Sequence, residues 1–281
     1  MSIMKKLKEY LNRPLSFAVF LLIIISTVIT ALTVVFIIGY IFIKGVPNLS
    51  LDLFSLKYSS SNQSMLPSII NTVYLTALTL LLAVPIGIFS AIYLAEYSRK
   101  NSFFVKIINI ANETLSGIPS IVYGLFGFLA FVISKKWGYS LLAGVITLAI
   151  MVLPLIIRTS QEAMLGVDDT FREASYGLGA GKLRTVFKIV LPSAMPGILS
   201  GIILAIGRIV GETAALIYTA GTVPEAATKL TSSSRTISVH LYCLLNEGLY
   251  TEQAYATAVV LIVFVVIINA FSNALAKKIM K

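Results

Sequence analysis

The chain of 281 residues is 57% hydrophobic and 12% charged, with a mean hydropathy of +0.92. Soluble domains carry about 25% charged residues, so this composition excludes an ordinary soluble domain and indicates a membrane protein. The net charge of +10 does not indicate a nucleic-acid partner, because the basic residues are spread over several loops rather than gathered on one face. A single cysteine, Cys243, and a single histidine, His240, predict neither a disulfide nor a metal site.

Several stretches are long and apolar enough to cross a bilayer, which takes about 20 residues in a helix. The six stretches are residues 15–43, 68–95, 114–134, 137–157, 194–220 and 253–276. The first has no charge between Leu15 and Ile43 and is longer than a signal-peptide core of about 7–15 residues, so we expect it to be retained. The sequence therefore predicts an all-α, polytopic membrane protein with six transmembrane helices, surrounded by lipid.

The distribution of Lys and Arg predicts which loops face the cytoplasm, because inner loops are enriched in these residues. With the N-terminus inside, fifteen fall on the inner side and six on the outer side, although Lys135 and Lys136 oppose the trend. We therefore expect both termini in the cytoplasm. The predicted segments are a cytoplasmic N-terminus with first helix and outer loop (1–67), a transmembrane core (68–272) with a cytoplasmic loop near 158–194, and a basic cytoplasmic tail (273–281).

The predicted cytoplasmic loop is too polar at its centre to cross the membrane. We expect two short helices in it, the first capped by Asp168 or Asp169 and ended by the glycines at 177–181. The second is expected to start at Lys182 and to be limited by Pro192.

The pair Gly181-Lys182 invites comparison with a phosphate-binding P-loop. Tyr176 stands where the first glycine of that loop belongs, however, and Leu183 stands where its hydroxyl residue belongs. We therefore do not expect this chain to bind or hydrolyse ATP itself.

The spacing of this segment resembles the cytoplasmic loop of binding-protein-dependent ABC importer permeases. The family pattern is E-A-A, three residues, Gly, nine residues and I-x-L-P, and it is met by Glu173-Ala174-Ser175, Gly179 and Ile189-Val190-Leu191-Pro192. The only departure is Ser175 for alanine. The resemblance implies a type I ABC importer permease fold without catalytic residues or a cofactor. It also implies that a separate ATPase docks on this loop, with Glu173, Ala174, Gly179, Ile189, Leu191 and Pro192 as the ATPase-coupling residues. An amphipathic interfacial helix is the alternative interpretation.

Two further segments resemble phosphate-specific members of this family. They are ETLSGIPSIVYGLFG at 113–127 and GRIVGETAALIYTAG at 207–221, and the second resembles the PstA-type subunit more than its PstC-type partner. The resemblance implies import of inorganic phosphate across the cytoplasmic membrane. It also implies a second permease subunit of PstC type, two copies of an ATP-binding subunit and an extracytoplasmic phosphate-binding protein.

Other substrates and classes stay open on the sequence. The loop motif is equally compatible with another oxyanion or small solute. An ion-coupled secondary carrier is the alternative outside this class, although no internal repeat is visible in the chain.

Arg208 and Glu212 place charge inside an otherwise apolar predicted span. Residues four apart share one face of a helix, so a helix through this span would place these two close enough to pair. Intramembrane charge costs about 2.5–3.5 kcal/mol at a helix centre and is usually retained for function or for a buried pair. A guanidinium suits phosphate oxygens, so Arg208, Glu212 and the adjacent Thr213 are candidate pathway residues. A purely structural ion pair is the alternative.

The third predicted span carries small residues at Ser116, Ser120 and Gly124, a spacing that permits close helix approach. Pro119 interrupts this helix and frees backbone groups where a pathway could run. Pro119 and Ser120 are therefore further candidate pathway residues, with simple helix packing as the alternative.

Overall fold

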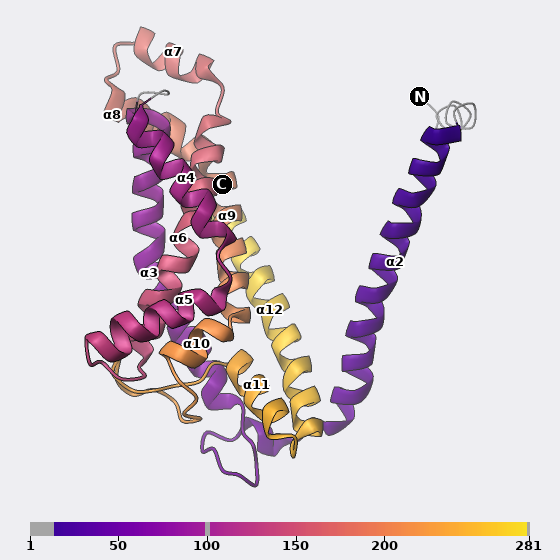
Figure 1. The fold of residues 1–281 in the computed structure, drawn as a ribbon. Coiled ribbons are helices and arrows are strands. Elements are labelled where there is room, and N and C mark those ends of the chain that lie inside the picture. Colours follow the sequence, from indigo (N-terminus) through magenta and orange to yellow (C-terminus); the bar gives the residue numbers. More distant parts are fainter. Residues whose placement is uncertain (1–13, 99–101, 280–281) are drawn as a thin grey trace.

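The computed structural model describes residues 14–98 and 102–279, and within them the chain is helical and contains no strand. The predicted basic N-terminus, up to Arg13, lies outside these residues. In chain order the helices in Figure 1 are α2 (Pro14–Gly45), α3 (Leu66–Ile92), α4 (Phe103–Gly117), α5 (Ser120–Gly127), α6 (Leu141–Leu165), α7 (Asp169–Gly177), α8 (Lys182–Thr185), α9 (Leu191–Gly211), α10 (Ala214–Thr219), α11 (Ile237–Glu247) and α12 (Thr251–Ile279).

Three of these helices are extended by π-helical turns, and two short 3₁₀ turns follow α2. The π-helical turns are Tyr93–Tyr97 after α3, Phe128–Ser134 after α5 and Val186–Val190 between α8 and α9. The 3₁₀ turns are Val46–Asn48 and Leu51–Phe54.

Helix α6 forms the centre of the bundle and packs against α3 and α9. Its side chains Leu148, Val152 and Ile156 are completely buried. The oxygen of Ser140 caps its start by accepting a hydrogen bond from the backbone N–H of Ala143. Because α6 is apolar on nearly all sides, burial between other helices is the arrangement expected for it.

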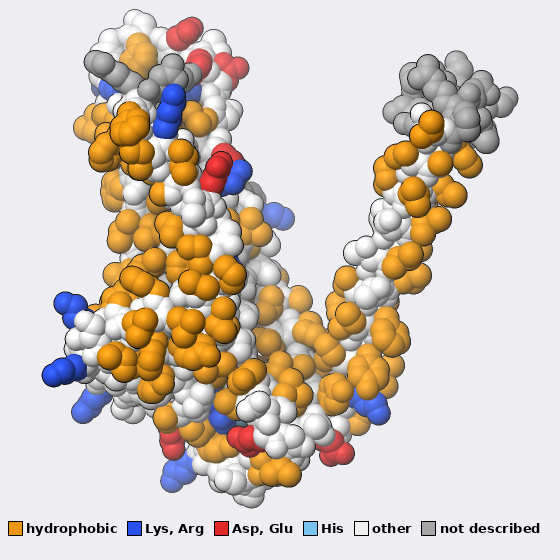
Figure 2. Space-filling view, in the orientation of Figure 1, with side chains coloured by type: hydrophobic (Ala, Val, Ile, Leu, Met, Phe, Trp, Pro, Cys, Tyr) orange, Lys and Arg blue, Asp and Glu red, His pale blue; other side chains and the backbone are white. Residues whose placement is uncertain are grey.

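The described residues contain five helices long and apolar enough to span a membrane, and six if the bent pair of α4 and α5 is counted as one span. Figure 2 shows hydrophobic side chains over much of the visible surface, with Asp and Glu toward the upper and lower ends and several Lys and Arg projecting from the left edge. The predicted all-α, polytopic architecture with six spans is confirmed.

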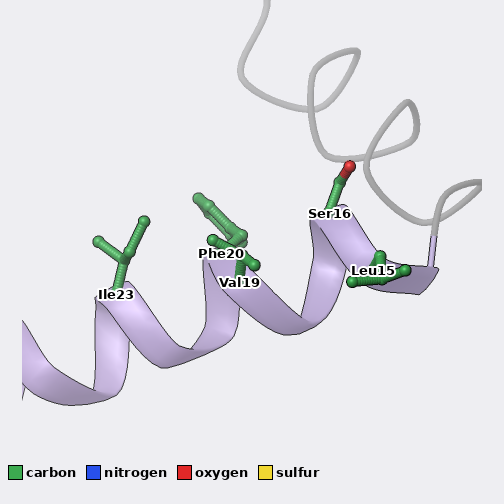
Figure 3. Close-up of a pocket in the computed structure, with 5 residues that line it drawn as sticks. All are labelled: Leu15, Ser16, Val19, Phe20 and Ile23. Carbon is green, nitrogen blue, oxygen red and sulfur yellow. The ribbon is translucent and has the colours of Figure 1, made fainter.

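Helix α2 stands apart from the other helices and meets them only near its end at α12 (Figure 1). Gly45 permits this contact, because a Cβ atom there would collide with the backbone carbonyl of Tyr255. The rings of Tyr40 and Tyr255 meet edge to face, with centroids 5.9 Å apart. The rest of α2 exposes apolar side chains, and the shallow hollow between Leu15 and Ile23 in Figure 3 lies on this single helix. It is an open helix face and not an enclosed cavity.

The third predicted span, 114–134, is not one continuous helix in the structure. The helix begins earlier, at Phe103, and breaks at Ile118 and Pro119, where the axis turns by 101°. Pro119 lacks a backbone N–H and restricts the residue before it to an extended conformation, which is why the break falls there. Ser116 therefore does not share a helix face with Gly124 across this break.

The fifth predicted span, 194–220, also differs from the structure at both ends. Pro192 does not end the helix that starts at Lys182, because helix continues from Lys182 to Gly211. The wide π-helical turn just before Pro192 accommodates a residue without an N–H. The helix ends instead at Gly211, since Glu212 has an extended backbone, and the short α10 follows.

The long connection before α11 is tied to the start of α3 by hydrogen bonds. The side-chain amide of Asn71 donates to the carbonyl of Glu225 at 2.9 Å and accepts from the N–H of Ala227 at 2.8 Å. The hydroxyl of Thr72 accepts from the N–H of Ile237 at 3.0 Å. Asn71 and Thr72 are both buried, so these bonds fix the connection on the end of α3.

The burial of polar residues in and just before α11 was not expected from the sequence. Arg235, placed by the sequence in an outer loop, is 4% exposed and lies over the ring of Tyr58 at 4.7 Å. His240 is completely buried and Cys243 is half-buried. Among the described residues, no group of three potential ligands could hold a metal ion.

Candidate functional site

The segment between α6 and α9 folds into a hairpin that projects at the top of Figure 1, at the opposite end of the molecule from α11. Asp168 caps α7 by accepting from the backbone N–H and the hydroxyl of Thr170, and these bonds lower the pKa of the Asp168 carboxyl. The turn is made at Gly179, whose φ of +81° is in the region that favours glycine. Lys182 then begins α8. The predicted cap, glycine turn and second helix start are all confirmed.

The two arms of the hairpin are bonded to each other below the turn. The hydroxyls of Ser175 and Thr185 lie 2.8 Å apart, and both residues are buried. The N–H of Ala180 donates to the carbonyl of Ser175 at 3.1 Å. The serine that replaces alanine in the family pattern therefore serves as a cross-link between the arms.

The hairpin brings three of the six predicted ATPase-coupling residues together around one hollow. Ala174, Gly179 and Ile189 line one hollow of about 360 Å³ between the arms. Glu173 is exposed on α7, whereas Leu191 packs on the apolar cluster beneath the hairpin and Pro192 is exposed at the start of α9.

Large apolar side chains are exposed on this hairpin, although it lies at a charged end of the molecule. Leu178 is 90% exposed, Leu183 is 67% exposed and Phe171 is 55% exposed. Exposed apolar side chains that gather on a polar surface are typical of a protein contact. These three residues were not singled out in the sequence, where they read as ordinary members of short helices.

The second part of the candidate site lies where two spans are interrupted. Helices α5 and α10 pack against each other, so the break at Pro119 and the break at Glu212 belong to the same region of the bundle. A Cβ atom on Gly124 would lie 2.8 Å from the Cα atom of Ala215, so glycine is required for this contact. Ser120 is the first residue of α5 and is half-buried. Thr213 is half-buried in the second break.

The ion pair that the sequence permits between Arg208 and Glu212 is not formed. Within residues 14–98 and 102–279, the ion pairs within 4.0 Å are Arg158–Glu162, Arg172–Glu96 and Arg172–Asp169. Because the helix ends at Gly211, Glu212 does not follow Arg208 on a helical face. The carboxylate instead accepts from the backbone N–H of Ala215 at 3.1 Å and so bonds the start of α10.

Two residues that the sequence did not single out complete this region. The hydroxyl of Tyr123 donates to the carbonyl of Leu115 at 2.8 Å, across the break at Pro119. The positive charge of Arg208 also acts on Tyr123. The hydroxyl of Ser238 donates to the carbonyl of Glu212 at 2.7 Å. Tyr123 lies in the quoted 113–127 segment, whereas Ser238 is distant in sequence, so no local pattern could have indicated it.

A polar hollow of about 210 Å³ lies between α4 and α6. Its lining includes Asn112, Glu113, Arg158 and Glu162. Arg158 and Glu162 form an exposed pair at 2.9 Å. The hollow thus lies between α6, a candidate span, and α4, the first half of the bent helix pair. Polar groups and interrupted helices within the membrane region are features of membrane transport proteins.

Comparisons with known proteins agree with this class. Residues 83–281 match the family described as binding-protein-dependent transport system inner membrane component. The chain is 34% identical to the phosphate transport system permease protein PstA of Pasteurella multocida over 234 residues, covering 82% of this chain and 83% of the relative. It is 32% identical to a probable ABC transporter permease protein, YqgI, of Bacillus subtilis, covering 86% of this chain and 88% of the relative.

Solved structures show the same fold. A bacterial ABC transporter that imports the acidic polysaccharide alginate matches with a TM-score of 0.67 and 18% identity, covering 99% of this chain and 100% of the other. The MetNI methionine ABC transporter matches with a TM-score of 0.58 and 17% identity, covering 76% of this chain and 94% of the other. These two proteins are named for different cargoes, so the fold alone does not define a substrate.

The chain belongs to the binding-protein-dependent transport system inner membrane component family and has the fold of a type I ABC importer permease. This assignment confirms the prediction of a transport permease rather than an ATPase. It also places the protein in the membrane as a multi-pass component.

The hydrogen bond from Ala215 to Glu212 predicts unequal effects of two substitutions. Glu212→Ala removes the acceptor and leaves the N–H unbonded, which costs about 1 kcal/mol, or about 2–4 °C in unfolding midpoint for a chain of this size. Glu212→Gln keeps an acceptor oxygen and should shift the midpoint less. A thiol-reactive dye that labels Cys243 on unfolding gives the measurement, and equal shifts in the two variants would contradict the capping role.

Proposed function

We propose that this chain is the permease subunit of an ATP-driven importer that moves inorganic phosphate across the cytoplasmic membrane. The observation that carries the proposal is Arg208, which lies in the last turn of α9 beside the break at Glu212 and forms no ion pair within residues 14–98 and 102–279. The chain is also similar over four fifths of its length to a phosphate transport permease. The guanidinium of Arg208 is half-buried, and no carboxylate among residues 14–98 and 102–279 forms an ion pair with it. Such a cation attracts an anion, and its planar donors match phosphate oxygens.

The role of Arg208 in this proposal is to attract phosphate transiently as it passes the breaks. The Glu212 carboxylate accepts a hydrogen bond from the start of α10 and does not form an ion pair with Arg208. Pro119, Ser120 and Thr213 belong to the same two breaks, and irregular backbone at membrane depth is tolerated where it lines a cavity. These five residues are the pathway residues of the proposal.

The hairpin of α7 and α8 is the proposed docking element for a separate ATPase subunit. Its exposed Leu178, Leu183 and Phe171 supply the apolar contact, and Glu173, Ala174 and Gly179 carry the family motif. Two ATPase copies are expected, one on this chain and one on a second permease subunit of PstC type.

Helix α2 supports the presence of a second permease. It leaves the bundle and exposes apolar side chains over its length, so it needs lipid or another subunit on several faces. An extracytoplasmic phosphate-binding protein would deliver the substrate at the end of the molecule where α11 lies.

The proposed orientation places the hairpin and both termini in the cytoplasm, in line with the excess of basic residues on that side. Leu183→Cys, in a Cys243→Ala background, should react with a membrane-impermeant thiol reagent only after the cells are opened. Leu249→Cys, 81% exposed at the other end, should react in intact cells. Reaction of position 183 from outside would overturn the orientation.

The docking proposal predicts that Gly179→Val weakens ATPase binding while the chain still enters the membrane. A β-branched residue is strained at φ +81°, so the turn and the hollow beside it would change shape. Gly177→Val is the matched control, since Gly177 is helical, exposed and has open space for a side chain. Co-purification of the ATPase is the measurement, and normal binding and uptake by Gly179→Val would show that the turn has no docking role.

The substrate proposal predicts that Arg208→Gln nearly abolishes phosphate uptake while the complex still assembles. Arg208→Lys keeps the charge without the planar donors and should retain partial uptake. Because Arg208 and Glu212 do not pair, adding Glu212→Gln should not restore transport.

Uptake of radiolabelled phosphate, normalised to assembled complex, measures these effects. Lys44→Gln is the control for removal of one positive charge at the end of α2. Full recovery in the Arg208→Gln, Glu212→Gln double variant would refute the anion contact. Stronger competition by sulfate than by unlabelled phosphate would favour another oxyanion as the substrate.

A further inference from the structure

Arg172, the residue just before the family motif, points back from α7 into the protein. Its side chain is 13% exposed and that of Glu96 is 6% exposed. The guanidinium donates twice to one carboxylate oxygen of Glu96, from Nη2 at 2.7 Å and from Nε at 3.2 Å. The pair joins residues 76 positions apart in the chain and so ties the hairpin to the end of α3.

The remaining donors of Arg172 are also used. Nη2 donates to the carbonyl of Met164 at 2.8 Å, and Nη1 donates to the carbonyl of Val167 at 2.7 Å and to Asp169 at 3.0 Å. All five N–H donors of the guanidinium therefore have an acceptor. Met164 lies in the last turn of α6, so one side chain bonds α7, α6 and the end of α3.

The second arm of the hairpin contacts the residue next to Glu96. The ammonium of Lys182, the first residue of α8, lies over the ring of Tyr97 at 5.0 Å from its centroid. Glu96 and Tyr97 both belong to the π-helical turn that ends α3. We call the four residues Glu96, Tyr97, Arg172 and Lys182 the α3 clasp.

Helix α3 extends from the clasp to the opposite end of the molecule (Figure 1). There Asn71 and Thr72 hold the connection before α11 by buried hydrogen bonds. Helix α3 also packs along α6, the centre of the bundle. One continuous helix thus joins the hairpin to the loop at the far end.

From this arrangement we infer that Arg172 and Glu96 are positioning residues for energy coupling. They make the hairpin and α3 move as one body, so that a displacement of the hairpin is passed to the far end of the bundle. The inference rests on the proposed docking of an ATPase on the hairpin. It concerns the step after docking, since the side chains of Arg172 and Glu96 are mostly buried, whereas Leu178, Leu183 and Phe171 on the same hairpin are exposed.

The test is to substitute Glu96 by Gln in the assembled complex, reconstituted in vesicles with its ATPase, second permease and binding protein. Glu96→Gln keeps the shape and one acceptor but removes the charge that holds Arg172. We expect the ATPase to bind as before and ATP to be hydrolysed, while phosphate imported per ATP falls about tenfold, within the usual range of coupling between sites. Arg172→Lys should give an intermediate ratio, because lysine cannot fill all five bonds.

Asp169→Asn is the matched control, because Asp169 is the exposed acceptor of the same guanidinium, with a side chain 78% exposed. Its ratio of phosphate to ATP should equal that of the unaltered protein. A residue with only a structural role would lower the amount of assembled complex and leave this ratio unchanged. An unchanged ratio in Glu96→Gln therefore overturns the inference.

A second substitution keeps the test decisive if Glu96→Gln does not assemble. Tyr97→Leu removes the contact with Lys182 without leaving a buried charge, and it should lower the ratio by a smaller factor. An unchanged ratio in that variant would overturn the inference. Failure of the docking proposal would be seen separately, as normal ATPase binding by Gly179→Val.

Discussion

Backbone N–H and C=O groups inside a bilayer have no water to bond, so every interruption of a helix must be bonded from elsewhere in the protein. Two spans of this chain are interrupted, at Pro119 and at Glu212, and both interruptions are served by side chains. Tyr123 bonds the carbonyl of Leu115, and Ser238 bonds the carbonyl of Glu212. Both bonds lie in the region where α5 packs on α10 and α11 contacts α10.

Hydrogen bonding of the side chain separates the roles of two arginines. Arg172 is enclosed, and each of its donors has an acceptor in the protein, as in a permanent structural joint. Arg208 is half-buried near Tyr123, and its charge is not neutralised by a described carboxylate. A guanidinium whose donors are all bonded holds elements together, whereas one without an ion pair in a broken span is suited to a passing anion.

The two ends of the molecule are built differently, and α3 connects them. At one end, a hairpin exposes apolar side chains and is joined to α3 by Arg172 and Lys182. At the other, buried Asn71 and Thr72 hold a long connection on the first turns of α3. Stiff contacts at both ends of one helix are what a protein needs if movement at one surface is to change the other.

The sequence by itself determined the class of fold and the local structure of the hairpin between α6 and α9, because both depend on local properties. Apolar runs of about 20 residues define spans in a bilayer, and the cap at Asp168, the turn at Gly179 and the helix start at Lys182 are set by residues next to one another. The tertiary structure decided where the spans break and which charges meet. Arg208 and Glu212 do not form an ion pair, because the helix ends at Gly211. The Arg172–Glu96 pair could not be predicted from the sequence, because it joins residues 76 positions apart. Spacing along a chain fixes neighbours only within one continuous helix, whereas contacts between helices depend on how the whole bundle packs.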